Sequence, residues 1–332
     1  MAKTRNEAAT SLAYQGGTSG PGGKRNGQPT KSRPLSCDDA SHGADGKTMG
    51  KDYRLRDEVR IGTWNVRTLM QTASLELLTR EMDRSKVQLL GLSEVRWKGK
   101  GHFTTDDGHT VYFSGNEKGG QRGVAFVANQ HVAKRVLGYN PINDRLISLR
   151  LQAKPINITI FQVYAPTTSA TDDVMDEFYN QLQDTLDAAS NRDVVIMIGD
   201  FNAKIGAGHC HEEEKVAIGK YGLGERNERG DSLVDFCIGN ELVVANTLFQ
   251  QHPRRLYTWQ SPDGKTRNQI DFILIKKRWK SAVRIAKTLP GADVGSDHQL
   301  LIANVRVKLK RVETSLRAKR FDVGRINNQY RV

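Results

Sequence analysis

The chain has 332 residues, a formal net charge of +13 and 37% hydrophobic residues, which is enough for one large packed domain or two small ones. Its three cysteines are far apart and form no Cys-x-x-Cys spacing, which argues against a disulfide framework or a zinc ribbon and favours a reducing compartment. The positive charge favours a polyanionic partner, either nucleic acid or an acidic membrane surface, although an inert basic surface has the same composition.

The sequence contains no sign of a membrane-spanning or secretory segment. The longest apolar stretches, such as residues 194–198, are far shorter than the roughly 20 residues that span a bilayer. The beginning of the chain lacks the apolar region of a signal peptide. We therefore expect a soluble, intracellular protein with no membrane partner.

Residues 1–57 have the composition of a disordered, basic-leaning arm. Residues 16–34 contain many turn-forming residues and no apolar periodicity, so they bury too little surface to offset the entropy of ordering. The lysines and arginines of this stretch suit nuclear import or nonspecific binding to a polyanion, and a plain linker has the same composition.

From residue 58 the pattern changes to short apolar segments bounded by Gly, Pro, Asn or Asp, which predicts β-strands. In chain order the predicted strands are 59–66, 87–95, 123–128, 145–152, 157–166, 193–202, 242–247, 257–260, 269–275 and 299–307. Apolar residues at helical spacing predict helices over 74–85, 171–189 and 230–240. We expect one α/β domain over residues 58–309, with packed sheets flanked by helices, and a basic tail or linker over 310–332.

Polar side chains with chemical roles gather at the ends of the predicted strands. They come from six separate segments and are Asn65, Glu94, Tyr164, Asp200, Asn202, Asp271, Asp297 and His298. Sites in layered α/β proteins are commonly assembled in this way, from loops at one edge of a rigid sheet. The Asp297–His298 pair alone would more often be an ordinary loop, and only the other segments make it a candidate site.

The residue types predict a hard divalent cation. Glu94 and Asn65 offer the oxygen ligands that Mg²⁺ prefers, with Mn²⁺ as the alternative, and the sequence has no thiolate or multi-histidine cluster for zinc. Mg²⁺ typically takes one or two carboxylates and keeps waters and substrate phosphate as its other ligands.

The remaining groups are suited to hydrolysis of a phosphate ester. Asp271 and His298 form a candidate pair in which the carboxylate orients and charges the imidazole. Asp200 is a candidate for activating water, and Asn202 for holding the phosphate. Phosphodiesters and phosphomonoesters both fit this chemistry.

In their order, the motif blocks resemble the endonuclease/exonuclease/phosphatase family, which includes DNase I-like nucleases. The blocks are TWNV (63–66), LSEVRW (92–97), VYAP (163–166), GDFNAKIG (199–206), NQIDFILI (268–275) and GSDHQLL (295–301). A single block is weak, whereas the ordered set over about residues 59–309 is specific. Among the branches, the sequence is most similar to endonuclease domains of RTE-type non-LTR retrotransposons and to domesticated proteins derived from them.

The resemblance implies a four-layer α/β sandwich with two central sheets. It also implies a role for each matching position, with Asp297 either linked to the metal or orienting His298. The implied catalytic residues are Asp200, Asn202, His298, Tyr164 and Asp271, and the implied metal ligands are Glu94, Asn65 and Asp297.

Two positions depart from the pattern of the abasic-site enzymes in this family. Arg67 stands where those enzymes usually carry an acidic residue, so metal binding would depend more on Glu94. Asn268 stands where they have a large aromatic residue that lines the abasic pocket. General or sequence-biased nicking of DNA therefore fits better than cleavage at abasic sites.

Basic residues near these blocks are the predicted contacts to a nucleic-acid backbone. They are Arg67, Arg96, Lys98, Lys100, Lys276, Lys277 and Arg278.

The leading hypothesis is a Mg²⁺-dependent DNA endonuclease of retrotransposon origin, located in the nucleus, with the cytoplasm as the alternative location. The alternative functions are a phosphoesterase acting on RNA or on inositol or lipid phosphates, and a domesticated DNA-binding protein without catalysis.

Overall fold

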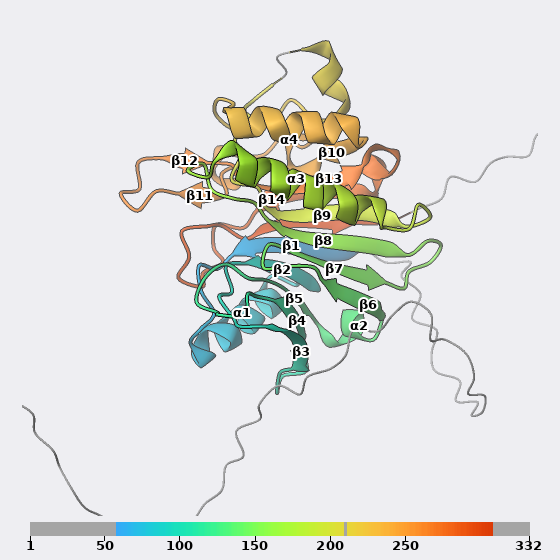
Figure 1. Ribbon diagram of the computed structural model, residues 1–332, viewed down its shortest axis with the longest axis vertical. Coiled ribbons are helices and arrows are strands. Elements are labelled where there is room, and N and C mark those ends of the chain that lie inside the picture. Colours follow the sequence, from blue (N-terminus) through green and yellow to red (C-terminus); the bar gives the residue numbers. More distant parts are fainter. Residues whose placement is uncertain (1–57, 209–210, 308–332) are drawn as a thin grey trace, which may run out of the picture.

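The computed structural model describes residues 58–208 and 211–307. The arm predicted for residues 1–57 and the tail predicted for 310–332 lie outside the described residues. Two sheets pack face to face, and helices cover their outer faces, so that four layers follow one another in the order helix, sheet, sheet, helix (Figure 1). The predicted four-layer α/β sandwich is confirmed.

The first sheet has seven strands, and its parallel pair β1–β2 brings two motif blocks to one edge. In spatial order the strands are β14 (Val283–Thr288), β15 (Leu301–Val305), β1 (Val59–Asn65), β2 (Leu89–Ser93), β5 (Val124–Ala128), β4 (Thr110–Ser114) and β3 (Lys100–Thr104). Asn65 lies opposite Ser93 in the register, so Glu94 follows directly beside it.

The second sheet has six strands, and it also ends in functional residues at one edge. Its order is β10 (Leu242–Val244), β13 (Asp271–Lys276), β9 (Val194–Asp200), β8 (Ile158–Tyr164), β7 (Leu146–Leu151) and β6 (Val136–Pro141). Tyr164 pairs with Asp200 across the parallel strands β8 and β9, and Asp271 pairs with Asp200 across antiparallel β13. A separate hairpin consists of β11 (Trp259–Gln260) and β12 (Arg267–Asn268).

The helices bury their apolar faces on the outer sides of the sheets. The helices are α1 (Thr72–Arg84), α2 (Gln130–Ala133), α3 (Asp172–Asp187) and α4 (Glu228–Gly239), with short 3-10 turns η1 (Glu212–Val216), η2 (Ala245–Thr247), η3 (Pro253–Arg255) and η4 (Lys277–Ala282). Leu78 of α1 packs on the first sheet, whereas Leu182 of α3 and Leu233 of α4 pack on the second. Asn227 caps α4 by accepting a hydrogen bond from the backbone N–H of Gly230, which satisfies an otherwise unpaired donor.

All ten predicted strands and all three predicted helices are present, and the structure adds strands that the sequence pattern did not predict. The added strands are β3, β4, β6, β12 and β14. β3 and β6 are edge strands with half-exposed or exposed residues, so they lack the continuous apolar run of a buried strand.

A buried polar cluster lies between the two sheets directly behind the functional edge. The side chain of Gln162 accepts a hydrogen bond from Thr63 Oγ1 at 3.3 Å and donates one to Ser93 Oγ at 2.9 Å. Gly91 makes room for it, because a Cβ there would lie 1.8 Å from Gln162 Oε1. These bonds satisfy Gln162 in an otherwise apolar layer and link the two sheets.

We expect the replacement of Gly199 by alanine to lower the free energy of unfolding by about 3 kcal/mol or more. A Cβ at Gly199 would lie 2.0 Å from the backbone oxygen of Val163, so β8 and β9 would have to separate one residue before Asp200. Urea unfolding measures the loss. Gly138→Ala is the matched control, because nothing lies within 4 Å of that Cβ. Equal stability of the two variants would contradict this packing.

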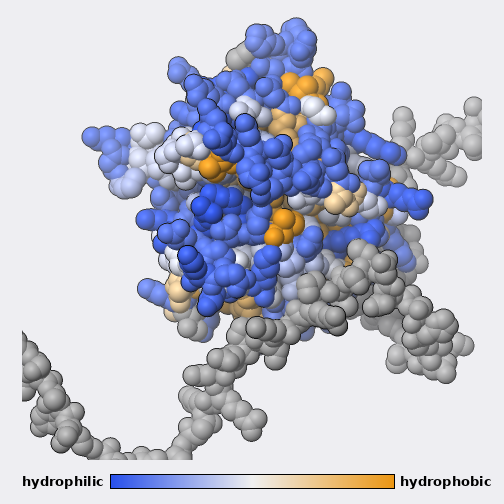
Figure 2. Space-filling view, viewed as in Figure 1, coloured by the Kyte–Doolittle hydropathy of each residue, from blue (hydrophilic) through white to orange (hydrophobic). Residues whose placement is uncertain are grey.

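No helix in the described ranges is long and apolar enough to cross a membrane. The face drawn in Figure 2 is mostly hydrophilic, with small, scattered hydrophobic spots. The exposed large hydrophobic side chains of the described residues are Met70, Leu77, Leu137, Val174, Val216 and Tyr221.

Candidate active site

The structure brings all eight predicted catalytic and metal-binding residues to one edge of the sandwich. Five strands contribute to this edge: β1, β2, β8 and β9 end there, and β13 begins there. The segment before β15 completes it, because the backbone carbonyl of His298 accepts a hydrogen bond from Trp64 Nε1 at 2.9 Å. Both sheets therefore fix the positions of the candidate groups.

Asp271, His298 and Asp200 form the buried centre of the site. His298 Nδ1 lies 2.9 Å from Asp271 Oδ2, and its Nε2 lies 4.0 Å from Asp200 Oδ2. Because the carboxylate of Asp271 can only accept when ionised, Nδ1 donates the proton in this bond. The Nε2 atom thus faces Asp200 without a direct hydrogen bond to it.

Hydrogen bonds fix the backbone on both sides of the imidazole. The backbone N–H of His298 donates to Ser296 Oγ at 3.1 Å, and that hydroxyl donates to the carbonyl of Asn65 at 2.6 Å. Thr258 Oγ1 accepts from the backbone N–H of Asp271 at 3.0 Å. The orientation of the pair therefore depends on three separate segments of the chain.

Burial and mutual charge shift the pKa values of this centre. Burial raises the pKa of Asp200 to about 7, with a further contribution from the charge of Asp271, while His298 opposes the shift. Burial alone would lower the pKa of His298, but the charge and hydrogen bond of Asp271 outweigh it and raise the pKa to about 9. Such opposed carboxylate and imidazole pairs are a mark of acid–base sites.

Glu94 and Asn65 form a second group beside this centre. Asn65 Nδ2 donates to Glu94 Oε1 and to Asp200 Oδ2, both at 2.9 Å. Tyr164 donates its hydroxyl to Glu94 Oε1 at 3.0 Å, and burial and then the charge of Glu94 raise the Tyr164 pKa. The side-chain oxygen of Asn65 accepts from the backbone N–H of Arg67 at 3.0 Å, so Asn65 links the two carboxylates as a donor.

Asn202 lies beside Asp200 and holds it from the backbone. Its N–H donates to Asp200 Oδ1 at 3.0 Å, while its side-chain Nδ2 donates to the carbonyl of Ala165 at 3.0 Å. The side-chain amide predicted to hold phosphate is thus engaged with the protein in this structure.

Asp297 does not orient the imidazole, and Asp271 has that role. Asp297 Oδ2 accepts from Trp259 Nε1 at 3.1 Å, and its Oδ1 lies 3.7 Å from Arg67 Nε. Of the two alternatives for Asp297, orienting His298 is therefore wrong. Arg67, which departs from the acidic pattern, gives this carboxylate a cationic neighbour.

Four non-glycine residues at this edge have left-handed backbone conformations. Their φ angles are +57° at Arg67, +59° at Glu94, +61° at Arg96 and +47° at Asn202. Such conformations cost about 1 kcal/mol or more each and cluster where the surrounding structure enforces them for function. The clustering supports this edge as the functional one.

Four of the predicted basic residues lie along the same edge. The Arg96 guanidinium donates to Glu94 Oε2 at 3.2 Å, and Arg67 is more than half exposed. Lys98 is exposed beside them, and Lys100 opens β3, where its Nζ donates to the carbonyl of Ile142 at 2.8 Å. The structure therefore places a basic border next to the carboxylates.

The other three predicted basic residues do not lie at this site. Lys276 ends β13, and Lys277 and Arg278 begin η4. Asp271, at the start of the same strand, faces the candidate centre, so these residues lie at the opposite end of the second sheet. The prediction that these three residues contact nucleic acid therefore concerns a surface away from the candidate active site.

The donor set at the edge fits a hard divalent cation. Asp271 Oδ1 and Asp297 Oδ1 are buried without a hydrogen-bond partner among the described residues, and Glu94 adds a half-buried carboxylate. Oxygen donors of this kind suit Mg²⁺ or Mn²⁺. Asp200, Asp271 and His298 each offer one potential ligand atom, and these three atoms lie within 4.8 Å of one another. A protonated imidazole does not bind a metal ion, however. The raised pKa of His298 therefore favours a metal position beside Glu94 over one between Asp200, Asp271 and His298.

Two residues outside the predicted set also support the site. The Arg145 guanidinium lies 5.3 Å from the centre of the Tyr164 ring and donates to the Tyr164 carbonyl at 3.1 Å. Burial lowers the pKa of this arginine. Trp259 contacts Asp297 from the β11–β12 hairpin. The sequence around each of these residues contains no motif that marks it, because each acts through a partner distant in sequence.

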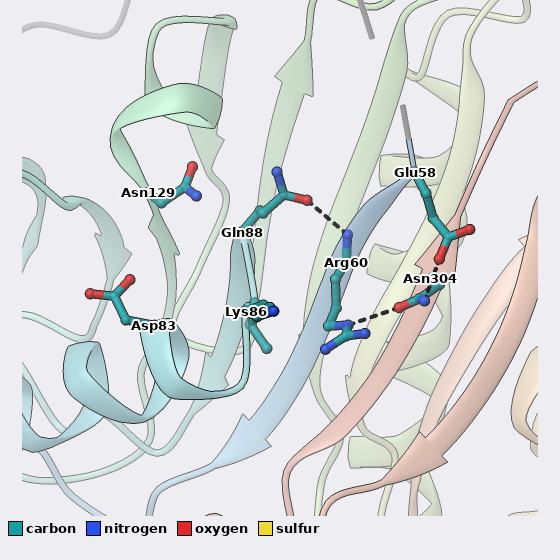
Figure 3. A pocket seen from close by; sticks show the side chains of 8 residues that line it. Glu58, Arg60, Asp83, Lys86, Gln88, Asn129 and Asn304 are labelled. Carbon is teal, nitrogen blue, oxygen red and sulfur yellow. Dashed lines mark hydrogen bonds between the residues drawn. The ribbon is translucent and has the colours of Figure 1, made fainter. Parts of the chain in front are cut away.

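A pocket of about 340 Å³ at the other end of the first sheet has a structural explanation. Figure 3 shows Arg60 directed into it between Gln88 and Asn304. The Arg60 guanidinium donates to Asn304 Oδ1 at 2.9 Å and to the carbonyl of Ser85 at 2.7 Å. The Arg60 guanidinium therefore links β1 to β15 and to the end of α1, and these hydrogen bonds account for its position in the pocket.

A model of the Endonuclease/Exonuclease/phosphatase family matches residues 62–298, which is more than two thirds of the chain. The chain belongs to this family. The match confirms the resemblance drawn from the ordered motif blocks. The family comprises hydrolytic nucleases and phosphatases, and its matched region includes the whole candidate site.

The chain is also similar to curated proteins from two mammals. Craniofacial development protein 2 of Tragulus javanicus is 48% identical over 262 residues, which cover 79% of this chain and 45% of that protein. This chain thus spans about half the length of the curated relatives it matches.

Two solved structures share the fold of this chain. The endonuclease domain of TRAS1, a telomere-specific non-LTR retrotransposon, superposes with a TM-score of 0.55 over 76% of this chain and 100% of that chain, at 15% identity. The 3′ phosphatase NExo from Neisseria, bound to a product DNA hairpin, gives a TM-score of 0.56 over 74% and 99%, at 18% identity.

Proposed function

We propose that this chain is a divalent-metal-dependent DNA endonuclease of retrotransposon origin, which nicks DNA by hydrolysing a phosphodiester bond. The observation that carries the proposal is the buried centre in which Asp271 holds His298 at 2.9 Å and His298 faces Asp200. A buried carboxylate with a pKa near 7 beside a cationic imidazole suits proton transfer and charge stabilisation at a phosphate.

Asp200 has the position and the pKa of a general base. It takes a proton from water above pH 7, where its carboxylate is ionised. Asn65 and the backbone N–H of Asn202 each donate to one of its two oxygens, so the carboxylate is held in one orientation. A base with this fixed geometry directs the attacking oxygen.

His298 provides positive charge where the phosphate would gain negative charge. Its Nδ1 proton is held by Asp271, so its Nε2 proton is the one that points into the site and donates to a phosphate oxygen. Tyr164 adds a hydroxyl close by, bonded to the oxygen of Glu94 that Arg96 does not contact. These groups stabilise the charge that develops during hydrolysis.

Glu94 is the residue that we propose to hold Mg²⁺ or Mn²⁺, with Asp297 contributing. A bound divalent cation polarises a phosphate oxygen and neutralises its charge. Asn65 acts as a positioning residue, because its amide donates to both Glu94 and Asp200.

DNA is the proposed substrate because the border of the site is basic and because a family neighbour is bound to a DNA hairpin. Arg67, Arg96 and Lys98 would contact backbone phosphates, which gives salt-dependent and largely sequence-independent affinity. RNA and inositol or lipid phosphates are the alternative substrates, and hydrolysis of these in place of plasmid DNA would identify them. A nuclear location follows from this substrate and stays a prediction.

The metal site can be tested by titrating Mg²⁺ in a nicking assay. We expect wild-type nicking to stop in EDTA, and Glu94→Gln to raise the Mg²⁺ concentration for half-maximal rate about tenfold or more. Glu117→Gln is the matched control, since Glu117 is an exposed carboxylate in a loop near the same edge. Nicking in EDTA, or an unchanged Mg²⁺ midpoint in Glu94→Gln, would contradict the assignment.

A further inference from the structure

A large open groove lies at the end of the second sheet opposite the candidate active site. We call it the far-end groove, and it is lined by residues 155–157, 186–187, 189–193 and 276–279 together with Arg150, Val195 and Glu241. Its volume is about 1280 Å³, above the roughly 300–1,000 Å³ of pockets for small ligands. Its size therefore fits a segment of a polymer better than a single small molecule.

The register of the strands separates this groove from the catalytic centre. β13 runs antiparallel to β9, so Asp271 lies beside Asp200 while Ile275 lies beside Ile196. The strand from Asp271 to Lys276 rises about 17 Å, at about 3.4 Å per residue. A ligand in the groove would therefore lie about one strand length from the candidate active site.

The lining of the groove carries cations that the protein does not neutralise. Arg192, Lys277 and Arg278 line it and form no ion pair among the described residues. The acidic residue at its base is already neutralised, because Asp193 accepts from Arg150 at 2.7 Å and 3.2 Å and from a threonine hydroxyl at 2.8 Å. Asp187 and Glu241 are the other two acidic residues of the lining.

An indole ring lies among these cations. Trp279 is half buried and packs against the apolar layer between the sheets, which fixes the ring. The guanidinium of Arg278 lies over the indole ring, 5.2 Å from its centre, so a base would stack on this face as the guanidinium moves to a phosphate. A fixed aromatic ring with adjacent cations is the arrangement on which unpaired bases stack while their phosphates are neutralised.

We propose that the far-end groove binds a segment of single-stranded nucleic acid, with Arg192, Lys277 and Arg278 contacting phosphates and a base stacking on Trp279. A duplex keeps its bases paired and away from the ring, whereas a single strand presents them. The groove is an accessory site, and its binding requires neither metal nor catalysis. It stands independently of the proposed endonuclease activity.

Binding of a fluorescent oligothymidylate to the full chain, followed by anisotropy in EDTA across a series of salt concentrations, tests this proposal. We expect Lys277→Gln with Arg278→Gln to weaken binding about tenfold. The slope of log K against the logarithm of the salt concentration should become about 1.4 shallower, because each phosphate that the protein no longer neutralises accounts for about 0.7. Arg80→Gln with Lys86→Gln is the matched control, because it removes two exposed positive charges at and just after α1, on the first sheet, and neither residue lines the groove.

Trp279→Leu separates stacking from phosphate binding. It should weaken binding while leaving the salt slope unchanged, with folding checked by the melting temperature. Equal affinity and slope in wild type and the groove double variant would overturn the proposal, as would an equal weakening in the control. A double variant that binds anionic vesicles more weakly but the oligonucleotide as tightly as wild type would also overturn it. Because EDTA prevents cleavage, a protein without nicking activity gives the same test.

Discussion

Replacing Asp200 with asparagine is expected to reduce the nicking rate about 10³-fold, within the 10²–10⁴ range for a general base. Asparagine has nearly the same shape, but its amide nitrogen would face one of the two donors, Asn65 Nδ2 or the backbone N–H of Asn202, and lose that hydrogen bond. The reduced rate reflects the missing base where the variant keeps its fold. Rates on supercoiled plasmid at pH 8 measure the effect, and the melting temperature reports folding.

Asp176→Asn is the matched control for this experiment. Asp176 lies exposed on α3, so the change removes one carboxylate charge without touching the candidate site. We expect its rate to equal that of wild type. A folded Asp200→Asn protein that nicks within about threefold of wild type would assign the base to another residue.

Replacing Asp271 with asparagine is expected to move the alkaline limb of the pH–rate profile to lower pH. In wild type the rate should rise as Asp200 loses its proton near pH 7 and fall as His298 loses its proton near pH 9, so the maximum lies between them. Asp271 raises the His298 pKa by charge and hydrogen bond, while burial lowers it. Without that charge, only the charges of Asp200 and Asp297 oppose the effect of burial, so the imidazole becomes neutral at lower pH than in wild type.

The pH profiles of the two proteins at saturating Mg²⁺ measure this shift. We expect the alkaline limb of Asp271→Asn to move by more than about one pH unit, with a maximal rate at least about tenfold lower. The acid limb should stay or move to lower pH, because the charge of Asp271 contributes to the raised pKa of Asp200. An unchanged alkaline limb would mean that His298 does not titrate in the reaction.

The sequence predicted the edge of the site because local patterns carry that information. Short apolar runs predict strands, and residues that follow parallel strands meet at one edge of a sheet, which brought Asn65 beside Glu94 and Tyr164 beside Asp200. The ordered motif blocks then supplied the family and its fold. The pairing of His298 with Asp271 was also predicted and is confirmed at 2.9 Å.

The details that depend on packing between distant segments were not predictable. Asp297 precedes His298 in sequence but turns away to Trp259 and Arg67, since side-chain directions at a loop depend on partners elsewhere in the chain. The amide of Asn65 donates to both carboxylates because the two sheets place them on either side of it. Charge alone also did not show that the basic residues at the end of β13 lie at the end of that strand opposite the site.

The central claim is that the Asp271–His298–Asp200 centre hydrolyses DNA phosphodiester bonds. Nicking of supercoiled plasmid by the purified 332-residue chain in Mg²⁺, with His298→Ala beside it, tests this claim most directly. We predict conversion to the open circular form by wild type, none in EDTA, and a rate at least about 10²-fold lower in the variant with its melting temperature retained. Folded wild-type protein that leaves the plasmid supercoiled in both Mg²⁺ and Mn²⁺, or a His298→Ala variant that nicks at the wild-type rate, would contradict the claim.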